Sequence, residues 1–264
     1  MAPYLIGVSL KMYFSHAQTV EWCRAVSAIA RRHPAVQGGG AELFVIPTFP
    51  SIPAALDALG AGVAVGAQDL AAADAGAFTG EVSGAEIAEL GCRVVEVGHA
   101  ERRSLFGETD AVVRAKTEAA LRNGLTPVLC VGEDTADGGG QGDPIAASHE
   151  CVRQIDDALA SARAAGHGGR VIVAYEPRWA IGAPAPAGPE HIRTVCSRLR
   201  EHVSGLADFA GSAVIYGGSA RPGLLSDVGH DVDGLFLGRF AHDPSALEAI
   251  LDEAHTLTTA GARR

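Results

Sequence analysis

A chain of 264 residues could hold two average domains or one large domain, because single α/β barrels also reach about 250 residues. Its composition, 47% hydrophobic and 20% charged, is that of a globular protein with one large core and argues against disorder. The formal net charge of −10, with no run of Lys or Arg longer than two residues, argues against a nucleic-acid partner and against binding to an acidic membrane surface.

Short β-branched or apolar runs recur along the chain, and each is expected to form a strand. In chain order they are YLIGVS (4–9), ELFVIP (42–47), VAVGAQ (63–68), RVVEVG (93–98), TPVLCVG (126–132), RVIVAYE (170–176), SAVIYGG (212–218) and GLFLGR (234–239). Continuous rather than alternating hydrophobicity indicates strands that are covered on both faces, as in a parallel sheet with helices outside.

Segments with helical spacing lie between these runs. In residues 111–124, for example, Val112, Ala115, Ala119 and Leu121 are expected near one face, with Gly124 at the end of the helix. Eight strand–helix units in this length predict an α/β fold, a closed (β/α)8 barrel. The alternative, an open doubly wound sheet, usually carries GxGxxG after its first strand, and GVSLKMY does not match that pattern.

One domain is expected over residues 1–264, with a frayed tail at 255–264. The loops at 36–42 and 133–144 are rich in glycine, but each leads directly into another strand or helix, so neither is expected to link two domains.

The five cysteines are odd in number and form no CxxC pair, which favours reduced thiols over a disulfide framework or a zinc site. The first residues lack a basic region followed by a long apolar stretch, and no window approaches 18 apolar residues. We therefore expect a cytoplasmic protein with no membrane partner.

Chemistry in such a barrel is expected where the strands run into the loops that follow them, because those loops converge on one open face. Lys11 follows the first strand closely, and Ser9 stands at its end. His99 follows the fourth strand and Glu176 ends the sixth. A candidate base, an imidazole and an ammonium group are therefore predicted to meet at this face.

Glu176 precedes Pro177, whose restricted backbone would hold a carboxylate firmly at the strand end. This position favours a general base, while the alternative is a structural carboxylate paired with Arg178. His99 precedes AERR, which is typical of a first helical turn, where the helix dipole disfavours an imidazolium. A neutral imidazole that donates to a carbonyl oxygen is one interpretation, and a hydrogen-bonded core histidine is the other.

The loops after strands seven and eight favour phosphate binding. YGGS supplies Gly217, Gly218 and Ser219, and LGR supplies Gly238 and Arg239. Barrels often bind phosphate through backbone N–H groups at these two loops, although glycine pairs also serve ordinary tight turns. The Gly/Pro-rich segment 179–189 is typical of a lid with stiff ends, or of a plain strand-to-helix connection.

Taken together, these residues resemble the triosephosphate isomerase family, along nearly the whole chain. The motifs that carry the resemblance are SLKM (9–12), GAFTGE (76–81), GHAERR (98–103), FGE (106–108), CVGE (130–133), AYEPRWAIG (174–182), YGGS (216–219) and DGLFLG (233–238). The resemblance implies Lys11 as the electrostatic lysine, His99 as the electrophile and Glu176 as the base. It also implies that Gly182, Ser219 and Gly238 hold the phosphate.

The mechanism implied by the resemblance is carbon-to-carbon proton transfer through an enediolate, with no cofactor and no metal. A tuned glutamate, a neutral histidine and a closing loop are known features of this family, so these roles come from the resemblance. The loop AADAGAFTGE (72–81) resembles the family's projecting loop that enters the partner subunit, with Phe78 and Thr79 near its tip. A homodimer is therefore implied, and a monomer with this loop in solvent is the alternative.

The chain departs from the family pattern at several positions of the site. Ser9 stands where Asn is usual, Leu10 for Trp, Ala100 for Ser and Arg239 for Gly, and the lid differs at 183–186. The smaller Ser9 could admit one more carbon or hydroxyl beside the reacting carbons. Ser9 together with DGLFLGR resembles the erythrulose-phosphate isomerase branch of the family.

Three hypotheses follow. The favoured substrates are a four-carbon pair, L-erythrulose 1-phosphate and D-erythrulose 4-phosphate, and the alternative is the three-carbon pair of triosephosphate isomerase itself. A catalytically idle sugar-phosphate binding protein is a remote alternative, because such a module has no need for the Lys, His and Glu set. A Schiff-base aldolase that uses Lys11 is disfavoured by the isomerase-like residues around that lysine.

Overall fold

A closed parallel barrel forms the centre of the molecule. The computed structural model describes residues 3–134 and 142–261, and in this part of the chain eight strands close in the order β1 to β8, with β1 pairing to both β2 and β8. The strands are β1 (Tyr4–Ser9), β2 (Ala41–Ile46), β3 (Ala64–Ala67), β4 (Val94–Val97), β5 (Thr126–Val131), β6 (Ile172–Tyr175), β7 (Ala213–Tyr216) and β8 (Gly234–Leu237). Each overlaps one of the eight predicted runs, and the (β/α)8 barrel is confirmed.

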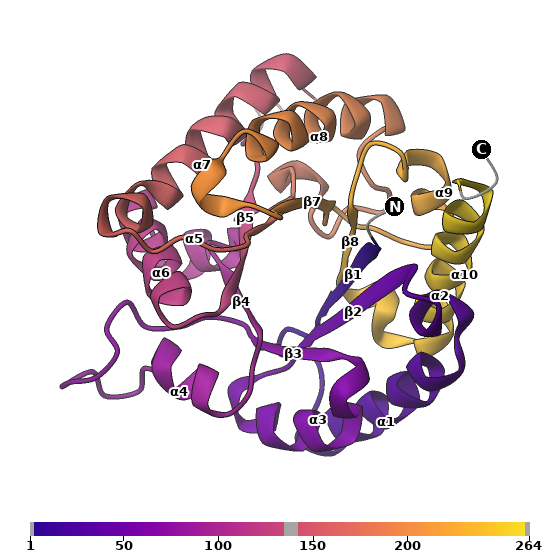
Figure 1. Ribbon diagram of the computed structural model, residues 1–264, viewed down its shortest axis with the longest axis horizontal. Coiled ribbons are helices and arrows are strands. Elements are labelled where there is room, and N and C mark those ends of the chain that lie inside the picture. Colours follow the sequence, from indigo (N-terminus) through magenta and orange to yellow (C-terminus); the bar gives the residue numbers. More distant parts are fainter. Residues whose placement is uncertain (1–2, 135–141, 262–264) are drawn as a thin grey trace.

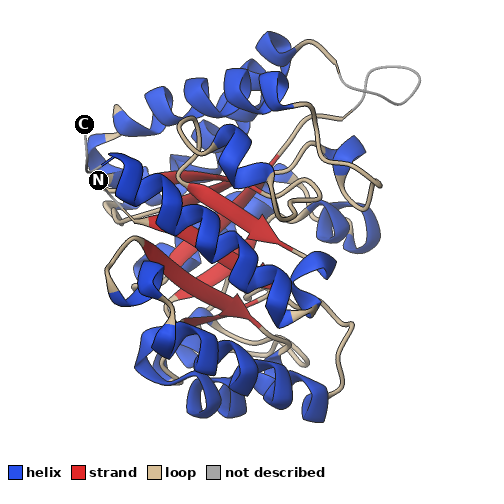
Figure 2. Ribbon diagram, turned by 90° about the vertical axis from the view of Figure 1, so that its right-hand side faces the viewer, coloured by secondary structure: helices blue, strands red, loops and turns tan. Residues whose placement is uncertain are grey.

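Helices surround the barrel on its outside, as Figures 1 and 2 show. They are α1 (His16–Arg32), α2 (Pro34–Gln37), α3 (Ile52–Leu59), α4 (Gly84–Glu89), α5 (Ala100–Phe106), α6 (Asp110–Arg122), α7 (Pro144–Ala165), α8 (Pro189–Ser204), α9 (Leu224–Val228) and α10 (Pro244–Gly261). Side-chain caps begin several of them, such as Ser15 at α1 and Asp143 at α7. These caps satisfy N–H groups that a helix leaves unpaired.

Alternate residues of each strand point to opposite sides of the barrel wall. Those that point inward form a small interior cluster: Leu5, Phe44, Ile46, Val94, Val128, Cys130, Ile172, Ala174, Ala213, Ile215 and Phe236. The rings of Phe44 and Phe236 stack with centroids 5.8 Å apart and fill part of the interior. The other alternate residues belong to the larger core between the barrel and its helices, which explains the continuous apolar runs.

The predicted face of the helix at 111–124 differs from the observed one. In α6, Val112 is exposed, and the buried residues are Val113, Lys116, Thr117, Ala119, Ala120 and Leu121. Lys116 turns inward because its ammonium donates to the carboxylates of Asp69 and Glu108, at 2.7 and 2.6 Å. A lysine can be buried when its charge is paired in this way.

The expected frayed tail at 255–264 is also different in the structure, where α10 continues as a helix to Gly261. Leu257 packs against the main core, and the hydroxyls of Thr258 and Thr259 donate to carbonyls in the preceding turn. The tip of the predicted loop at 133–144, residues 135–141, lies outside the described residues, as do 262–264. No helix in the described ranges is long and apolar enough to cross a membrane.

Candidate active site

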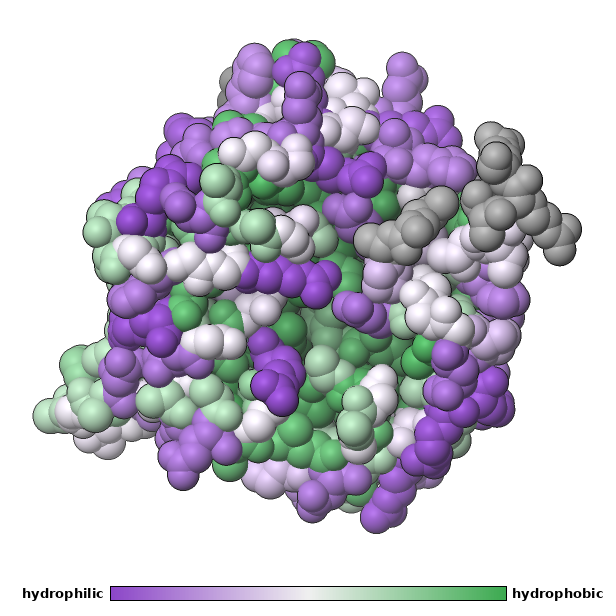
Figure 3. All heavy atoms as spheres, in the orientation of Figure 1, coloured by the Kyte–Doolittle hydropathy of each residue, from purple (hydrophilic) through white to green (hydrophobic). Residues whose placement is uncertain are grey.

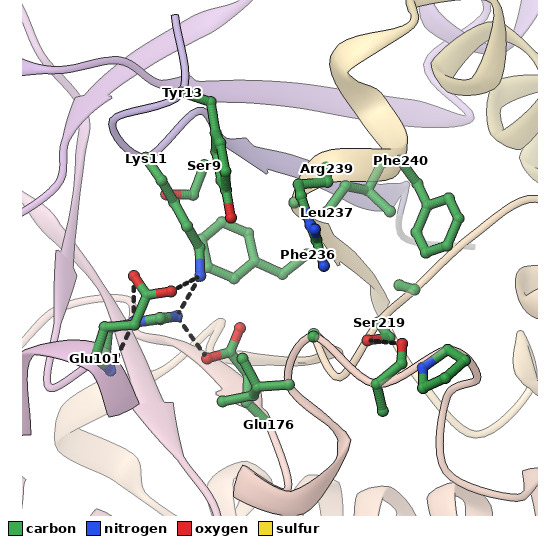
Figure 4. A pocket seen from close by; sticks show the side chains of 18 residues that line it. Ser9, Lys11, Tyr13, Glu101, Glu176, Ser219, Phe236, Leu237, Arg239 and Phe240 are labelled. Atoms are coloured by element: carbon green, nitrogen blue, oxygen red, sulfur yellow. Dashed lines mark hydrogen bonds and ion pairs between the residues drawn. The ribbon is translucent and has the colours of Figure 1, made fainter. Parts of the chain in front are cut away.

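A cavity of about 440 Å³ opens at the carboxyl ends of the strands (Figure 4). Of the predicted site residues, it is lined by Ser9, Lys11, His99, Glu176, Gly182, Gly217, Ser219, Gly238 and Arg239. Gly218 does not line it, and a Cβ at this position would lie 2.5 Å from the Tyr216 hydroxyl. Phe78 and Thr79 lie elsewhere, in the loop between β3 and α4. The predicted convergence at this end of the barrel is therefore observed for most of the set.

Lys11 reaches into the cavity from the loop after β1, with its backbone at a φ of 47°. Its Nζ donates to Glu101 Oε1 at 2.7 Å and lies 3.3 Å from His99 Nε2. Burial would lower the pKa of Lys11, but the hydrogen bond that Lys11 donates to Glu101 and the charges of Glu176, Glu101 and Glu96 raise it above its ordinary value. Lys11 is therefore a cation at neutral pH.

His99 is the N-cap of α5, and Gly98 before it has a φ of 73°, which favours glycine. The Nδ1 atom accepts a hydrogen bond from the backbone N–H of Glu101, at 3.1 Å. An imidazole that accepts at Nδ1 carries its proton at Nε2, so the ring is a neutral donor toward the cavity. That Nε2 atom lies 3.4 Å from Glu176 Oε2.

Glu176 directly follows β6, and its backbone N–H donates to Val131 O, at 2.8 Å. The side chain is buried, and Oε2 accepts no hydrogen bond from the described residues. Arg178, the suggested structural partner, pairs instead with Asp134 at 2.5 Å. A buried carboxylate oxygen without a hydrogen bond, facing a cavity, has the properties of a positioned base.

Gly217 makes room for this carboxylate. A Cβ at position 217 would lie 2.4 Å from Glu176 Oε1 and 2.7 Å from its Cγ. Neither distance is tolerable, so the Glu176 side chain would have to move. The glycine after β7 therefore fixes where the carboxylate can stand, and this is a reason for glycine beyond tight turning.

We predict that Gly217→Ala lowers kcat/KM by about 10²-fold, because a misplacement of about 1 Å at a reacting group has an effect of this size. Steady-state kinetics on the substrate proposed below measures it. The matched control is Gly62→Ala, which places the same methyl group in open space far from the cavity and should leave the rate unchanged. Wild-type kinetics for Gly217→Ala would contradict the role given to this glycine.

The opposite end of the cavity is built from the lid and the last two strand ends. Ser219 has a φ of 57°, and its hydroxyl lies within hydrogen-bonding distance of the lid carbonyls of Ala180 and Ala183, at 2.7 and 3.1 Å. The Tyr216 hydroxyl accepts from the N–H of Ala187 at 2.9 Å. Both ends of the lid are thereby attached to the segment that begins at β7.

Arg239 lines the cavity beside Gly238 and is drawn facing it in Figure 4. It is exposed and forms no ion pair with any described residue. An unpaired guanidinium beside backbone N–H groups suits a phosphate, which it can bind through two hydrogen bonds.

The sequence reasoning missed three side chains at or behind the cavity. Glu101 binds Lys11, and Tyr13 lines the mouth with its ring edge-on to His242 at 5.0 Å. Glu96 is buried in β4, and its Oε2 is hydrogen-bonded to the Ser9 hydroxyl at 2.8 Å. The signal for Glu96 was a single carboxylate inside an apolar run, three residues before His99.

The chain is similar to known proteins along nearly its whole length. The family model described as "Triosephosphate isomerase" matches residues 4–254. The L-erythrulose-1-phosphate isomerase of Pectobacterium atrosepticum is 51% identical over 255 residues, which cover 96% of each chain. The triosephosphate isomerase of a Synechococcus species is 34% identical over 96% of this chain and 97% of its own. That of Mycobacteroides abscessus is 39% identical over 89% and 90%.

Proposed function

Because the chain belongs to the triosephosphate isomerase family, we propose that it interconverts L-erythrulose 1-phosphate and D-erythrulose 4-phosphate by proton transfer, without a cofactor. The observation that carries the chemistry is the convergence of three groups in one cavity. His99 Nε2 lies 3.3 Å from Lys11 Nζ and 3.4 Å from Glu176 Oε2. The substrate choice is supported by the 51% identity to the Pectobacterium isomerase and by Ser9.

The proposed reaction starts with Glu176, which takes the proton from the carbon beside the carbonyl. The electron pair of that C–H bond becomes the C=C bond of an enediolate, and the carbonyl π pair moves to its oxygen. His99 gives its Nε2 proton to this oxygen and takes the proton of the neighbouring hydroxyl. Glu176 then returns its proton to the former carbonyl carbon, so the carbonyl has moved by one position and no oxidant is needed.

Lys11 stabilises the negative charge that develops on the enediolate oxygens. Its ammonium is preorganised by Glu101, so it does not need to reorient during the reaction. At the other end, we propose that the N–H groups of Gly182, Ser219 and Gly238 and the guanidinium of Arg239 hold the phosphate. The absence of an ion pair for Arg239 among the described residues supports this assignment.

The fourth carbon of the substrate extends past the two reacting carbons, away from the phosphate. With the phosphate at the Ser219 and Arg239 end, this carbon lies toward the wall that Ser9 helps to form. Serine is smaller than the usual asparagine, which leaves space for one hydroxymethyl group. This is the size argument for the four-carbon substrate.

We also propose a homodimer in the cytoplasm. The loop between β3 and α4 projects from the molecule in Figures 1 and 3, and Phe78 on it is 53% exposed. Met12, in the loop after β1, is 89% exposed. Large apolar side chains this exposed are typical of residues that a partner covers. Five free buried cysteines support a reducing compartment.

The proposed substrate is tested by measuring kcat/KM for L-erythrulose 1-phosphate and for glyceraldehyde 3-phosphate with the same enzyme preparation. We expect a preference of at least tenfold for the four-carbon sugar, which corresponds to about 1.4 kcal/mol of transition-state binding. A preference for glyceraldehyde 3-phosphate would favour the second candidate, triosephosphate isomerase, which the 34–39% identities to such enzymes support.

A further inference from the structure

Glu96 is a carboxyl group inside the barrel, behind the cavity. The alternation along β4 that points Val94 into the barrel interior also points Glu96 inward, one layer nearer the site. The side chain is almost fully buried, and its Oε2 lies 2.8 Å from Ser9 Oγ, within hydrogen-bonding distance. Its Oε1 lies 3.9 Å from His99 Nε2. It does not line the cavity itself, so it can act on a substrate only through its neighbours.

The charged and titratable groups that face Glu96 come from every neighbouring part of the barrel. Lys11 follows β1, His99 follows β4, Cys130 lies in β5 and Glu176 follows β6. Burial is the largest effect and raises the pKa of Glu96 above its ordinary value. His99, Ser9 and Lys11 oppose this rise, and the charge of Glu176 adds to it. The protonated form is therefore favoured relative to an exposed glutamate.

The protonation state of Glu96 decides which way the Ser9 hydroxyl points. A protonated carboxyl can donate to Ser9 Oγ, which leaves the Ser9 O–H free to donate into the cavity that Ser9 lines. An ionised carboxylate can only accept, so the Ser9 hydroxyl then donates to Glu96 and no longer donates into the cavity. The family's usual asparagine has its own amide donors and does not need such a partner, whereas a serine hydroxyl rotates freely.

We propose that Glu96 is a positioning residue that orients the Ser9 hydroxyl toward the oxygens at the far end of the sugar phosphate, and so contributes to recognition of the four-carbon substrate. This inference rests on the proposed function. The pair of Ser9 and Glu96 acts as one hydrogen-bonding unit, in which Ser9 touches the substrate and Glu96 holds Ser9.

Two variants test the proposal. Glu96→Gln keeps the shape, and its amide can donate to Ser9 Oγ as the protonated carboxyl does. Glu96→Leu removes the hydrogen bond. We expect Glu96→Gln to retain kcat/KM for L-erythrulose 1-phosphate within about threefold at neutral pH, and Glu96→Leu to lose about tenfold, the usual effect of one hydrogen bond. The loss on glyceraldehyde 3-phosphate should be smaller, because that substrate lacks the fourth carbon.

The pH profile distinguishes this role from a merely structural one. In the wild type, kcat/KM should fall as the pH rises through the raised pKa of Glu96, because the ionised carboxylate accepts the Ser9 hydrogen bond and turns that hydroxyl away from the cavity. Glu96→Gln has no proton to lose at this position, so its profile should stay flat over the same range. This readout remains available even if Glu96→Leu fails to fold.

Three results would overturn the inference: equal kcat/KM values for the Gln and Leu variants, an equal loss on both substrates, or an alkaline fall that persists unchanged in Glu96→Gln. Failure of the proposed function has a different signature. It would appear in the wild type, as turnover of glyceraldehyde 3-phosphate with none of L-erythrulose 1-phosphate.

Discussion

Glu176→Gln is expected to lower kcat by about 10²–10⁴-fold, the usual contribution of a general base. The amide has the shape of the carboxylate but cannot accept the proton from carbon. Steady-state turnover of L-erythrulose 1-phosphate measures the loss, and KM should change little because the phosphate contacts are elsewhere. The control is Glu190→Gln, the same chemical change on an exposed residue of α8, which should turn over normally.

Glu176→Asp sharpens the same prediction. It keeps the carboxylate but withdraws it by about one carbon–carbon bond, and kcat should fall by about 10²-fold or more because proton transfer depends steeply on position. Near-normal turnover of either variant would reject Glu176 as the base.

Lys11→Met should have the second largest effect. It removes the cation that faces the substrate at the reacting end of the cavity, and the loss of one preorganised electrostatic group lowers kcat by about 10²–10³-fold. KM should rise as well, because the substrate is an anion and the variant leaves Glu101 and Glu176 without the ammonium beside them. Stability should change little, because the Glu101 side chain is 45% exposed and can be solvated.

Lys11→Arg serves as the matched control for charge. It keeps the cation but replaces a compact ammonium by a planar fork, so its activity should lie between those of the wild type and Lys11→Met. If the Met variant retained kcat and KM close to those of the wild type, the electrostatic role of Lys11 would be refuted.

The barrel could be predicted from the sequence because its strands are covered on both faces, so that each appears as a continuous apolar run. Lys11, His99 and Glu176 could be predicted for a related reason. They stand at strand ends, and in a closed parallel barrel all strand ends face the same cavity. The positions of these three groups follow from topology alone, without knowledge of any side-chain contact.

What the sequence could not predict depends on contacts between distant segments. Glu96 lies inside a predicted strand, and only the inward alternation shared with Ser9 shows that the two side chains meet. The inward turn of Lys116 depends on two carboxylates from other parts of the chain. The steric role of Gly217 requires the position of the Glu176 side chain. None of these pairings leaves a local pattern in the sequence.

The most direct test of the central claim, proton transfer on a four-carbon sugar phosphate, is turnover of L-erythrulose 1-phosphate in deuterated water. The product, D-erythrulose 4-phosphate, is followed by NMR. If the proton that Glu176 removes from carbon exchanges with the deuterated solvent, the product will carry deuterium on the former carbonyl carbon. Glu176→Gln should abolish both product and label. Binding of the sugar phosphate without any carbon-bound deuterium or product in the wild type would contradict the account.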